Sequence, residues 1–135
     1  MNEATGSRYP ALCPYLYYED TPAALDWLGR AFGFRERLRV TDDDGSVEHA
    51  EMELGDAVIM MGSPAGYHSA ARLGQVTSSV YVRIDDVDSH FQQAVAAGAG
   101  VLREPADQGY GERNYGVTDL EGQHWWFAQP LSLVT

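Results

Sequence analysis

The sequence predicts an α+β fold of two β-α-β-β-β modules, whose curved mixed sheets carry helices outside and border a concave cavity. Three observations lead to this prediction. A strand followed by a helix occurs twice, each half has room for three strands after its helix, and a constant offset relates the two copies.

The first half begins with the aromatic, strand-like stretch "LCPYLYYED". A helix is expected over "TPAALDWLGRAFGF", with Thr21 as N-cap, Pro22 in the first turn and Gly33 as its stop. Apolar residues recur there at helical spacing, namely Ala24, Leu25, Leu28 and Phe32. The following alternation around "DDDG" predicts a hairpin, and "AVIMMG" is the last strand of the half.

The second half repeats this order. "SSVYVRIDD" is a strand, and "VDSHFQQAVAAGAG" is a helix with Phe91, Val95 and a glycine stop. Two further strands are expected to be interrupted at Pro105 and at the Gly109–Gly111 turn, before the final strand in "QHWWFA". An offset of 66 residues carries the first strand and the last strand of the first half onto their counterparts, and it places Asp20 on Asp86, Tyr15 on Tyr81 and Met60 on Trp126.

The length and composition favour one folded domain over residues 1–135. With 44% hydrophobic and 21% charged residues, the chain can bury a core. Within the domain, the first module spans approximately residues 10–63, a small and polar linker 64–77, and the second module 78–130.

The strong negative charge excludes several partners. A net charge of −11, with nine arginines and no lysine, argues against nucleic acid and anionic membranes as partners, but suits a cationic small molecule. Since no long apolar run or signal segment is present, we expect a cytoplasmic protein. Cys13 is the only cysteine, so no intrachain disulfide or cysteine-based zinc cluster is expected, and a small buried thiol is favoured over a nucleophile.

Alternation within the strands predicts two different sheet faces. One face is aliphatic and suits the helices. The other carries aromatic and polar residues, which are Tyr15, Tyr17, His49, Glu51, Glu53, Tyr81, Arg83, His124 and Trp126. Two such faces would line a binding cavity. Adjacent tryptophans in a strand point to opposite sides, so Trp125 is assigned to the core and Trp126 to the cavity face.

At this level the chain resembles the vicinal oxygen chelate superfamily, which includes glyoxalases, extradiol dioxygenases and bleomycin-resistance-type proteins. The resemblance rests on three stretches. They are "YLYYEDTPAALDWLGRAFGF", "VYVRIDDVDSHFQQAVAAGA" and the ending "YGERNYGVTDLEGQHWWFAQP". The likeness covers roughly residues 10 to 130 and implies the two-module fold, although this fold supports many chemistries.

Metal-dependent members carry ligands near the start of each half's first strand and in each half's last strand. In this chain the corresponding residues are Cys13, Met60, Ser79 and Trp126. These side chains do not suit the hard divalent ions of the family, which prefer imidazole and carboxylate, so no metal and no other cofactor is expected. A displaced metal site built from His49, Glu51 and His124 is the alternative.

The candidate ligand-binding residues combine the aromatic face with one loop. Trp126 is interpreted as a wall on which a planar ligand stacks, the alternative being a side chain that fills a closed cavity. Arg83 and Arg113 are interpreted as clamps at this face or its rim, the alternative being ion pairs with acids. His68 and His90 are expected to be exposed. The full set is Tyr15, Tyr17, Met60, Tyr81, Arg83, Tyr110, Arg113, His124 and Trp126.

The resemblance then implies a function through the antibiotic-resistance branch of the family. Its members sequester bleomycin, mitomycin or thiocoraline-type peptide antibiotics, as homodimers that often exchange an N-terminal strand; the stretch "SRYPALCP" suits such an exchange. We therefore expect metal-independent sequestration of an aromatic natural product, which can be peptidic or cationic. The alternatives are a glyoxalase- or dioxygenase-like enzyme with non-standard metal ligands, and a scaffold protein whose cavity is filled by its own side chains.

Overall fold

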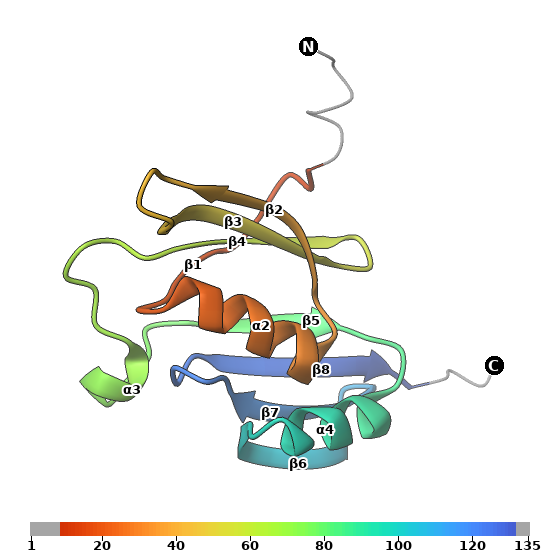
Figure 1. Cartoon of the computed structure of the whole chain (residues 1–135). Coiled ribbons are helices and arrows are strands. Elements are labelled where there is room, and N and C mark those ends of the chain that lie inside the picture. Colours follow the sequence, from red (N-terminus) through yellow and green to blue (C-terminus); the bar gives the residue numbers. More distant parts are fainter. Residues whose placement is uncertain (1–8, 132–135) are drawn as a thin grey trace. The chain divides into compact units, whose positions relative to one another are not determined.

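The computed structural model describes residues 9–131. The chain divides into two compact units, each with one four-stranded mixed sheet (Figure 1). Unit 1 contains the chain up to Gly29 and Gly33–His68, and unit 2 contains Arg30–Phe32 and the chain from Ser69 onward. The predicted α+β fold of two β-α-β-β-β modules is confirmed.

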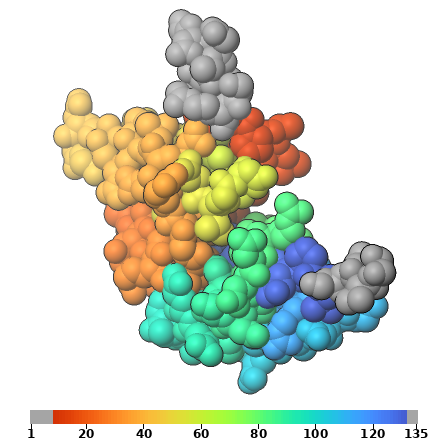
Figure 2. Space-filling view, turned by 90° about the vertical axis from the view of Figure 1, so that its right-hand side faces the viewer, coloured from red at the N-terminus to blue at the C-terminus, as the bar shows by residue number. Residues whose placement is uncertain are grey.

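Unit 1 contains the first sheet. Its elements are β1 (Tyr15–Tyr17), α2 (Thr21–Phe32, of which the last three residues belong to unit 2), β2 (Arg35–Thr41), β3 (Val47–Leu54) and β4 (Ala57–Gly62). The strand order is β1-β4-β3-β2, with β1 parallel to β4 and the other pairs antiparallel. The predicted β2–β3 hairpin is confirmed, and its gold-coloured atoms stand out from unit 1 in Figure 2. In its turn the carboxylates of Asp42 and Asp44 accept hydrogen bonds from the Ser46 amide.

Helix α2 begins one residue earlier than the sequence pattern predicts. Asp20 is the N-cap, and its carboxylate accepts a hydrogen bond from the Ala23 amide at 3.0 Å. The expectation that Thr21 caps the helix is wrong because the Thr21 hydroxyl is buried and bonded to the Ser63 hydroxyl at 2.6 Å. The predicted stop at Gly33 is confirmed, since its φ of 85° ends the helix in the left-handed conformation.

The apolar stripe of α2 is confirmed as core. Ala24, Leu25 and Leu28 are buried in unit 1, and Phe32 is buried in unit 2. The inward-facing side chains of β3 and β4 are also buried, namely Ala50, Met52, Ile59 and Met61. The remaining face of this sheet is therefore left for polar and aromatic residues.

Unit 2 contains the second sheet. Its elements are α3 (Ala70–Leu73), β5 (Ser79–Arg83), α4 (Val87–Ala96), β6 (Gly100–Gln108), β7 (Glu112–Thr118) and β8 (His124–Pro130). The strand order β5-β8-β7-β6 repeats that of the first sheet, with β5 parallel to β8. Asp86 caps α4 as Asp20 caps α2, because its carboxylate accepts a hydrogen bond from the Ser89 amide. The offset of 66 thus relates the caps as well as the strands.

Two details of unit 2 differ from the sequence-based expectation. Pro105 does not end a strand, because β6 continues through it. The pairing of β6 with β7 is irregular between Arg103 and Ala106, so Pro105 lies at a break in the regular ladder. On α4 the fully buried residues are Val87 and Ala94, whereas Val95 is 42% exposed.

The helices in the described part of the chain are short. Helix α3 has 4 residues, α4 has 10 and α2 has 12. No helix among residues 9–131 is both long and apolar enough to cross a membrane. Helix α3 lies in the predicted linker and buries none of its residues, as a polar connection should.

Candidate functional site

Unit 2 has one sheet face that its helix does not cover. Helix α4 packs on the face of Tyr115 and Phe127, through Phe91 and His90. The opposite face, called here the open face of unit 2, is crossed by a row of residues in register, one from each strand. The row consists of Tyr81 on β5, Trp126 on β8, Gly116 on β7 and Arg103 on β6, and is called the Trp126 row.

The Trp126 ring lies over β7 so closely that only glycine fits at position 116 beneath it. A Cβ atom at Gly116 would lie 2.3 Å from the Trp126 ring, which is far closer than real Cβ contacts. The Arg103 guanidinium lies 4.8 Å from the centre of the same ring, in a cation–π contact. Because Trp126 is only half-buried, this ring remains accessible on the open face.

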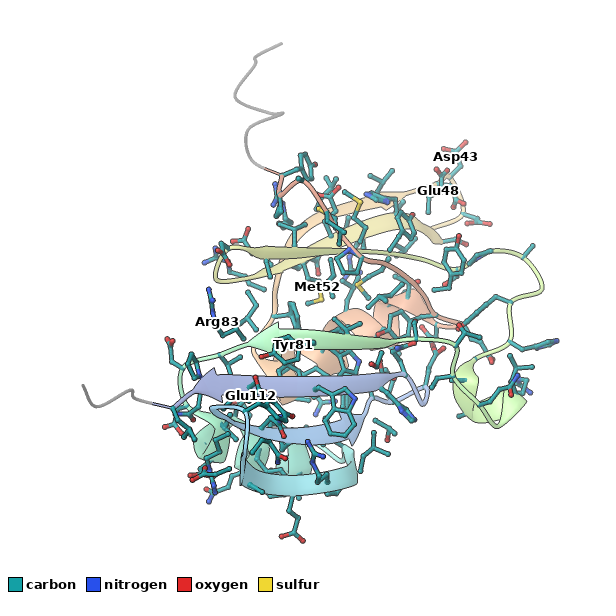
Figure 3. All side chains as sticks on the ribbon, turned by 180° about the vertical axis from the view of Figure 1, so that it is seen from behind. Asp43, Glu48, Met52, Tyr81, Arg83 and Glu112 are labelled. Atoms are coloured by element: carbon teal, nitrogen blue, oxygen red, sulfur yellow. The ribbon has the colours of Figure 1, made fainter. Side chains whose placement is uncertain are left out.

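A chain of hydrogen bonds holds the polar groups around the Trp126 row. Arg103 donates to the Oδ1 atom of buried Asn114 at 2.6 Å, and the Asn114 amide donates to Glu112 at 2.6 Å and to the Tyr110 hydroxyl at 3.1 Å. The Tyr81 hydroxyl donates to Glu112 at 2.5 Å. Figure 3 labels Tyr81 and Glu112 in unit 2. The hydrogen bond to Glu112 raises the pKa of Tyr81 to about 12, so its hydroxyl stays protonated at neutral pH.

Trp125, by contrast, belongs to the core of unit 2, as predicted. Its side chain is fully buried and stacks on Phe127 with ring centres 5.9 Å apart. Its indole N–H donates to the carboxylate of buried Asp119 at 3.0 Å. The same carboxylate accepts hydrogen bonds from the amides of Glu121 and Gln123, so Trp125 also anchors the β7–β8 turn.

Most of the predicted residues in unit 2 lie on the open face. Arg83 and His124 alternate with the core residues of β5 and β8, and Tyr110 joins the same face through Asn114. Arg83 is exposed, and no ion pair of it is found within residues 9–131. The prediction that Arg113 reaches this face is wrong. Its guanidinium binds Asp88 on α4 and Asp107 on β6, because alternation along β7 turns it to the helix side.

Unit 1 has a comparable face with different chemistry. The row in register is Tyr15 on β1, Met60 on β4, Glu51 on β3 and Leu38 on β2. The Tyr15 hydroxyl bonds to His49 Nδ1 at 2.9 Å, and His49 Nε2 bonds to Glu51 at 2.9 Å. Burial and the nearby Tyr17 and Glu51 raise the pKa of Tyr15. Met60 therefore lies between Tyr15 and Glu51, which belong to one hydrogen-bonded polar network.

An open pocket of about 460 Å³ adjoins this face. It is lined by Tyr15, Tyr17, Asp42, Ser46, Val47, Glu48, Gly62, Ser63 and Pro64. Tyr17 contacts both Tyr15 and Tyr67 edge-on, with ring centres 5.8 and 5.7 Å apart. The two predicted tyrosines of unit 1 thus form one wall of a pocket that also carries carboxylates.

The candidate metal ligands do not gather in the described part of the chain. Within residues 9–131, no group of three or more His, Cys, Asp or Glu side chains is placed to hold a metal ion. His49 and Glu51 are bonded to each other, and the half-buried Cys13 thiol lies 3.6 Å from the Pro10 carbonyl. The expectation that the protein uses no metal or other cofactor stays a prediction.

His90 is a half-buried histidine that packs on the core of unit 2, contrary to the expected exposure. Its Nε2–H donates to the Phe32 carbonyl at 2.8 Å, so its Nδ1 accepts the Tyr115 hydroxyl at 2.6 Å. The ring also packs against Phe127, with centres 4.3 Å apart. Burial lowers the pKa of His90, and the hydrogen bond to Phe32 opposes this effect only in part.

This environment predicts that unit 2 loses stability in mild acid. Because the folded-state pKa of His90 lies below its unfolded value, stability is full above about pH 6.5. It falls as pH drops towards the folded-state pKa, by at most about 1.4 kcal/mol per pH unit. Urea denaturation between about pH 7.5 and 5.5 measures this slope. His90→Gln should flatten it and exposed His68→Gln should not; equal slopes in both variants would contradict this assignment.

Several residues of these networks were missed in the sequence. Arg103 was missed because Pro105 was taken to interrupt the strand. Gly116 carried a usable signal, since a glycine inside a strand often marks a close approach of another group. The remaining missed residues are Tyr9, Arg37, Glu112 and Asn114, whose partners in the networks depend on tertiary contacts.

Comparison with known proteins agrees with this architecture. Residues 11–127 match the model of the Glyoxalase/Bleomycin resistance protein/Dioxygenase superfamily. The Mycobacterium bovis protein Mb0911c is 32% identical over 128 residues, which cover 90% of this chain and 84% of that protein.

Solved structures show the same fold. TioX from Micromonospora sp. ML1 is 33% identical with a TM-score of 0.72, and the match covers 93% of this chain and 100% of TioX. A glyoxalase-related enzyme from Clostridium phytofermentans shares the fold at 13% identity, with a TM-score of 0.69 over 90% of this chain and 95% of that enzyme. The chain therefore belongs to the glyoxalase/bleomycin resistance protein/dioxygenase superfamily.

Proposed function

We propose that this protein binds and sequesters a planar aromatic natural product without a metal ion, as an antibiotic self-resistance protein does. The observation that carries the proposal is Trp126. It is half-exposed on the open face of unit 2, at a position where metal-dependent members of the family carry a ligand. Sequestration requires only affinity and enough protein, so no reacting group is needed.

The geometry of the Trp126 row supports binding by stacking. Gly116 leaves room for the indole to lie on the sheet, so that the ring is held in place between the sheet and Arg103. The guanidinium of Arg103 is planar, and its position over the ring shows that the indole face accommodates a flat group. A flat ligand that takes the place of this guanidinium can make the same kind of contact, with about 0.5–1.5 kcal/mol from ring geometry in addition to the buried area.

The polar groups beside Trp126 support orientation of the ligand. The Tyr81 hydroxyl donates a hydrogen bond to Glu112, so its oxygen can still accept a hydrogen bond from a ligand. Arg83 is an exposed cation on the same face and suits a carbonyl or carboxylate of the ligand. The net charge of −11 favours ligands that are neutral or cationic overall.

Family membership supports the same proposal, since the resistance branch of this superfamily binds bleomycin, mitomycin or thiocoraline-type peptide antibiotics. We place the protein in the cytoplasm as a homodimer.

Fluorescence titration with these three antibiotic types tests the proposal. At least one ligand should quench tryptophan emission saturably, and Trp126→Ala should weaken its binding by about 30-fold, the effect of losing a binding hot spot of about 2 kcal/mol. Trp27→Phe is the matched control, because Trp27 is a buried tryptophan of unit 1. Unchanged affinity of Trp126→Ala for every ligand that binds the parent would overturn the stacking wall.

A further inference from the structure

Unit 1 holds a buried carboxylate on the sheet face that carries Tyr15 and Met60. The Glu51 side chain is 4% exposed, although it lies on the polar face of β3. Removing a carboxylate from water is costly unless hydrogen-bond donors replace the water. The groups that contact Glu51 therefore indicate which kind of ligand this carboxylate can bind.

Two side chains, Tyr9 and His49, supply these donors, and Arg37 adds an ion pair. His49 Nε2 lies 2.9 Å from Oε2, and Arg37 Nε lies 3.4 Å from Oε1. The Tyr9 hydroxyl lies 3.0 Å from Oε1 and 3.2 Å from Oε2, so it bridges both oxygens. His49 and Arg37 belong to β3 and β2 of the same sheet, whereas Tyr9 comes from the segment before β1.

The ring of Tyr9 is held as a bound aromatic ligand would be held. The Arg37 guanidinium lies 4.8 Å from the centre of the Tyr9 ring, a cation–π contact. Arg37 reaches this position because β2 has an irregular register between Glu36 and Leu38, which turns two consecutive side chains to one side. Tyr9, Arg37, Leu38, Glu51 and Glu53 line an open pocket of about 440 Å³ beside the ring.

The segment that carries Tyr9 is not part of the sheet of unit 1. Residues 9–14 belong to no helix or strand, and Leu12 within them is 78% exposed. Moving Tyr9 away would therefore break no backbone pairing of the sheet. It would, however, leave Glu51 without the donor that bridges its two oxygens.

We propose that Glu51 and Arg37 form a binding site for a hydroxyl-bearing aromatic ring, a phenol in its simplest form, and that Tyr9 occupies this site until the ligand replaces it. The ligand hydroxyl donates to Glu51, and its ring lies against the Arg37 guanidinium. The site lies within unit 1 and does not depend on Trp126. This proposal thus goes beyond the proposed function, and each of the two can be tested without the other.

Competition between the Tyr9 side chain and a phenol ligand for the same site has a measurable consequence. A ligand binds only the fraction of molecules in which the site is vacant, so its apparent affinity is reduced by that fraction. Deleting the Tyr9 side chain should remove this reduction. Tyr9→Phe should remove part of it, because phenylalanine keeps the ring but cannot donate to Glu51.

Titration of the whole chain with 4-methylphenol, followed by NMR chemical shifts, tests the proposal. Tyr9→Ala should bind this probe at least about tenfold more tightly than the parent, with Tyr9→Phe in between. The O-methyl ether of the probe has the same ring without a donor and should show no such gain. In the Tyr9→Ala background, Glu51→Gln should weaken phenol binding by about tenfold. Glu36→Gln is the matched control, because Glu36 is a carboxylate of β2 that pairs with Arg39 and does not line this pocket.

Two results would overturn the proposal. One is equal binding of 4-methylphenol to the parent, Tyr9→Phe and Tyr9→Ala; the other is a gain for the ether as large as the gain for the phenol. If Tyr9→Ala does not fold, the comparison between Tyr9→Phe and the parent decides alone. Because NMR shifts are read residue by residue, the gain in affinity should appear at Arg37 and Glu51, and any shift at Trp126 is read separately. This separates the outcome from a failure of the stacking site in unit 2.

Discussion

Replacing Trp125 by alanine is expected to lower the free energy of unfolding by about 3–5 kcal/mol, because it empties a large volume in the core of unit 2. The lost contacts include Phe127 and Phe32, whose ring centres lie 5.9 and 5.2 Å from that of Trp125. The change also removes the indole donor of buried Asp119. Urea denaturation followed by circular dichroism measures the effect.

The neighbouring Trp126→Ala is the matched control for this prediction. Since Trp126 is half-buried on the open face, its loss should change the free energy of unfolding by no more than about 1 kcal/mol. Two substitutions of the same type, one residue apart, should therefore differ by several-fold in their effect on stability. Equal destabilisation by both would mean that Trp126 is a core residue and that the open face is closed.

Replacing Gly116 by alanine is expected to abolish most ligand binding while the fold persists. The new methyl carbon would lie 2.3 Å from the Trp126 ring, so the indole must leave its place over β7. Loss of the positioned ring should cost about 2 kcal/mol of binding, or roughly 30-fold in Kd. Titration with a ligand that binds the parent, alongside a denaturation curve, measures both quantities.

Gly109→Ala provides the control for the glycine substitution. Gly109 lies in the β6–β7 turn, and a Cβ there would meet no atom within 4 Å. This variant should bind as the parent does. If Gly116→Ala also binds with the affinity of the parent, the ring over Gly116 does not form the binding surface.

The repeat was the most informative feature of the sequence for the fold. The offset of 66 aligned Tyr15 with Tyr81 and Met60 with Trp126, and the structure pairs Tyr15 with Met60 and Tyr81 with Trp126 in the two sheets. Alternation then separated Trp125 from Trp126 correctly. Both signals are local or periodic, so one sequence is enough to detect them.

The polar networks could not be predicted in the same way. Arg113 was assigned to the wrong face because its strand, β7, was only loosely delimited, and a shift of one residue reverses every side chain. The burial of Glu51 depends on Tyr9, which is 42 residues away in the chain. His90 was expected to be exposed, yet its partners Phe32 and Tyr115 lie 58 and 25 residues away. Such contacts arise from tertiary packing and produce no periodic pattern in the sequence.

The central claim is that the protein binds an aromatic ligand on the Trp126 row and leaves it unchanged. Equilibrium dialysis with a quenching ligand, followed by mass analysis of the recovered ligand, tests this claim most directly. We predict saturable, stoichiometric binding, complete recovery of ligand with its original mass, and loss of the binding in Trp126→Ala. Recovery of a chemically altered product, or equal binding by Trp126→Ala, would contradict it.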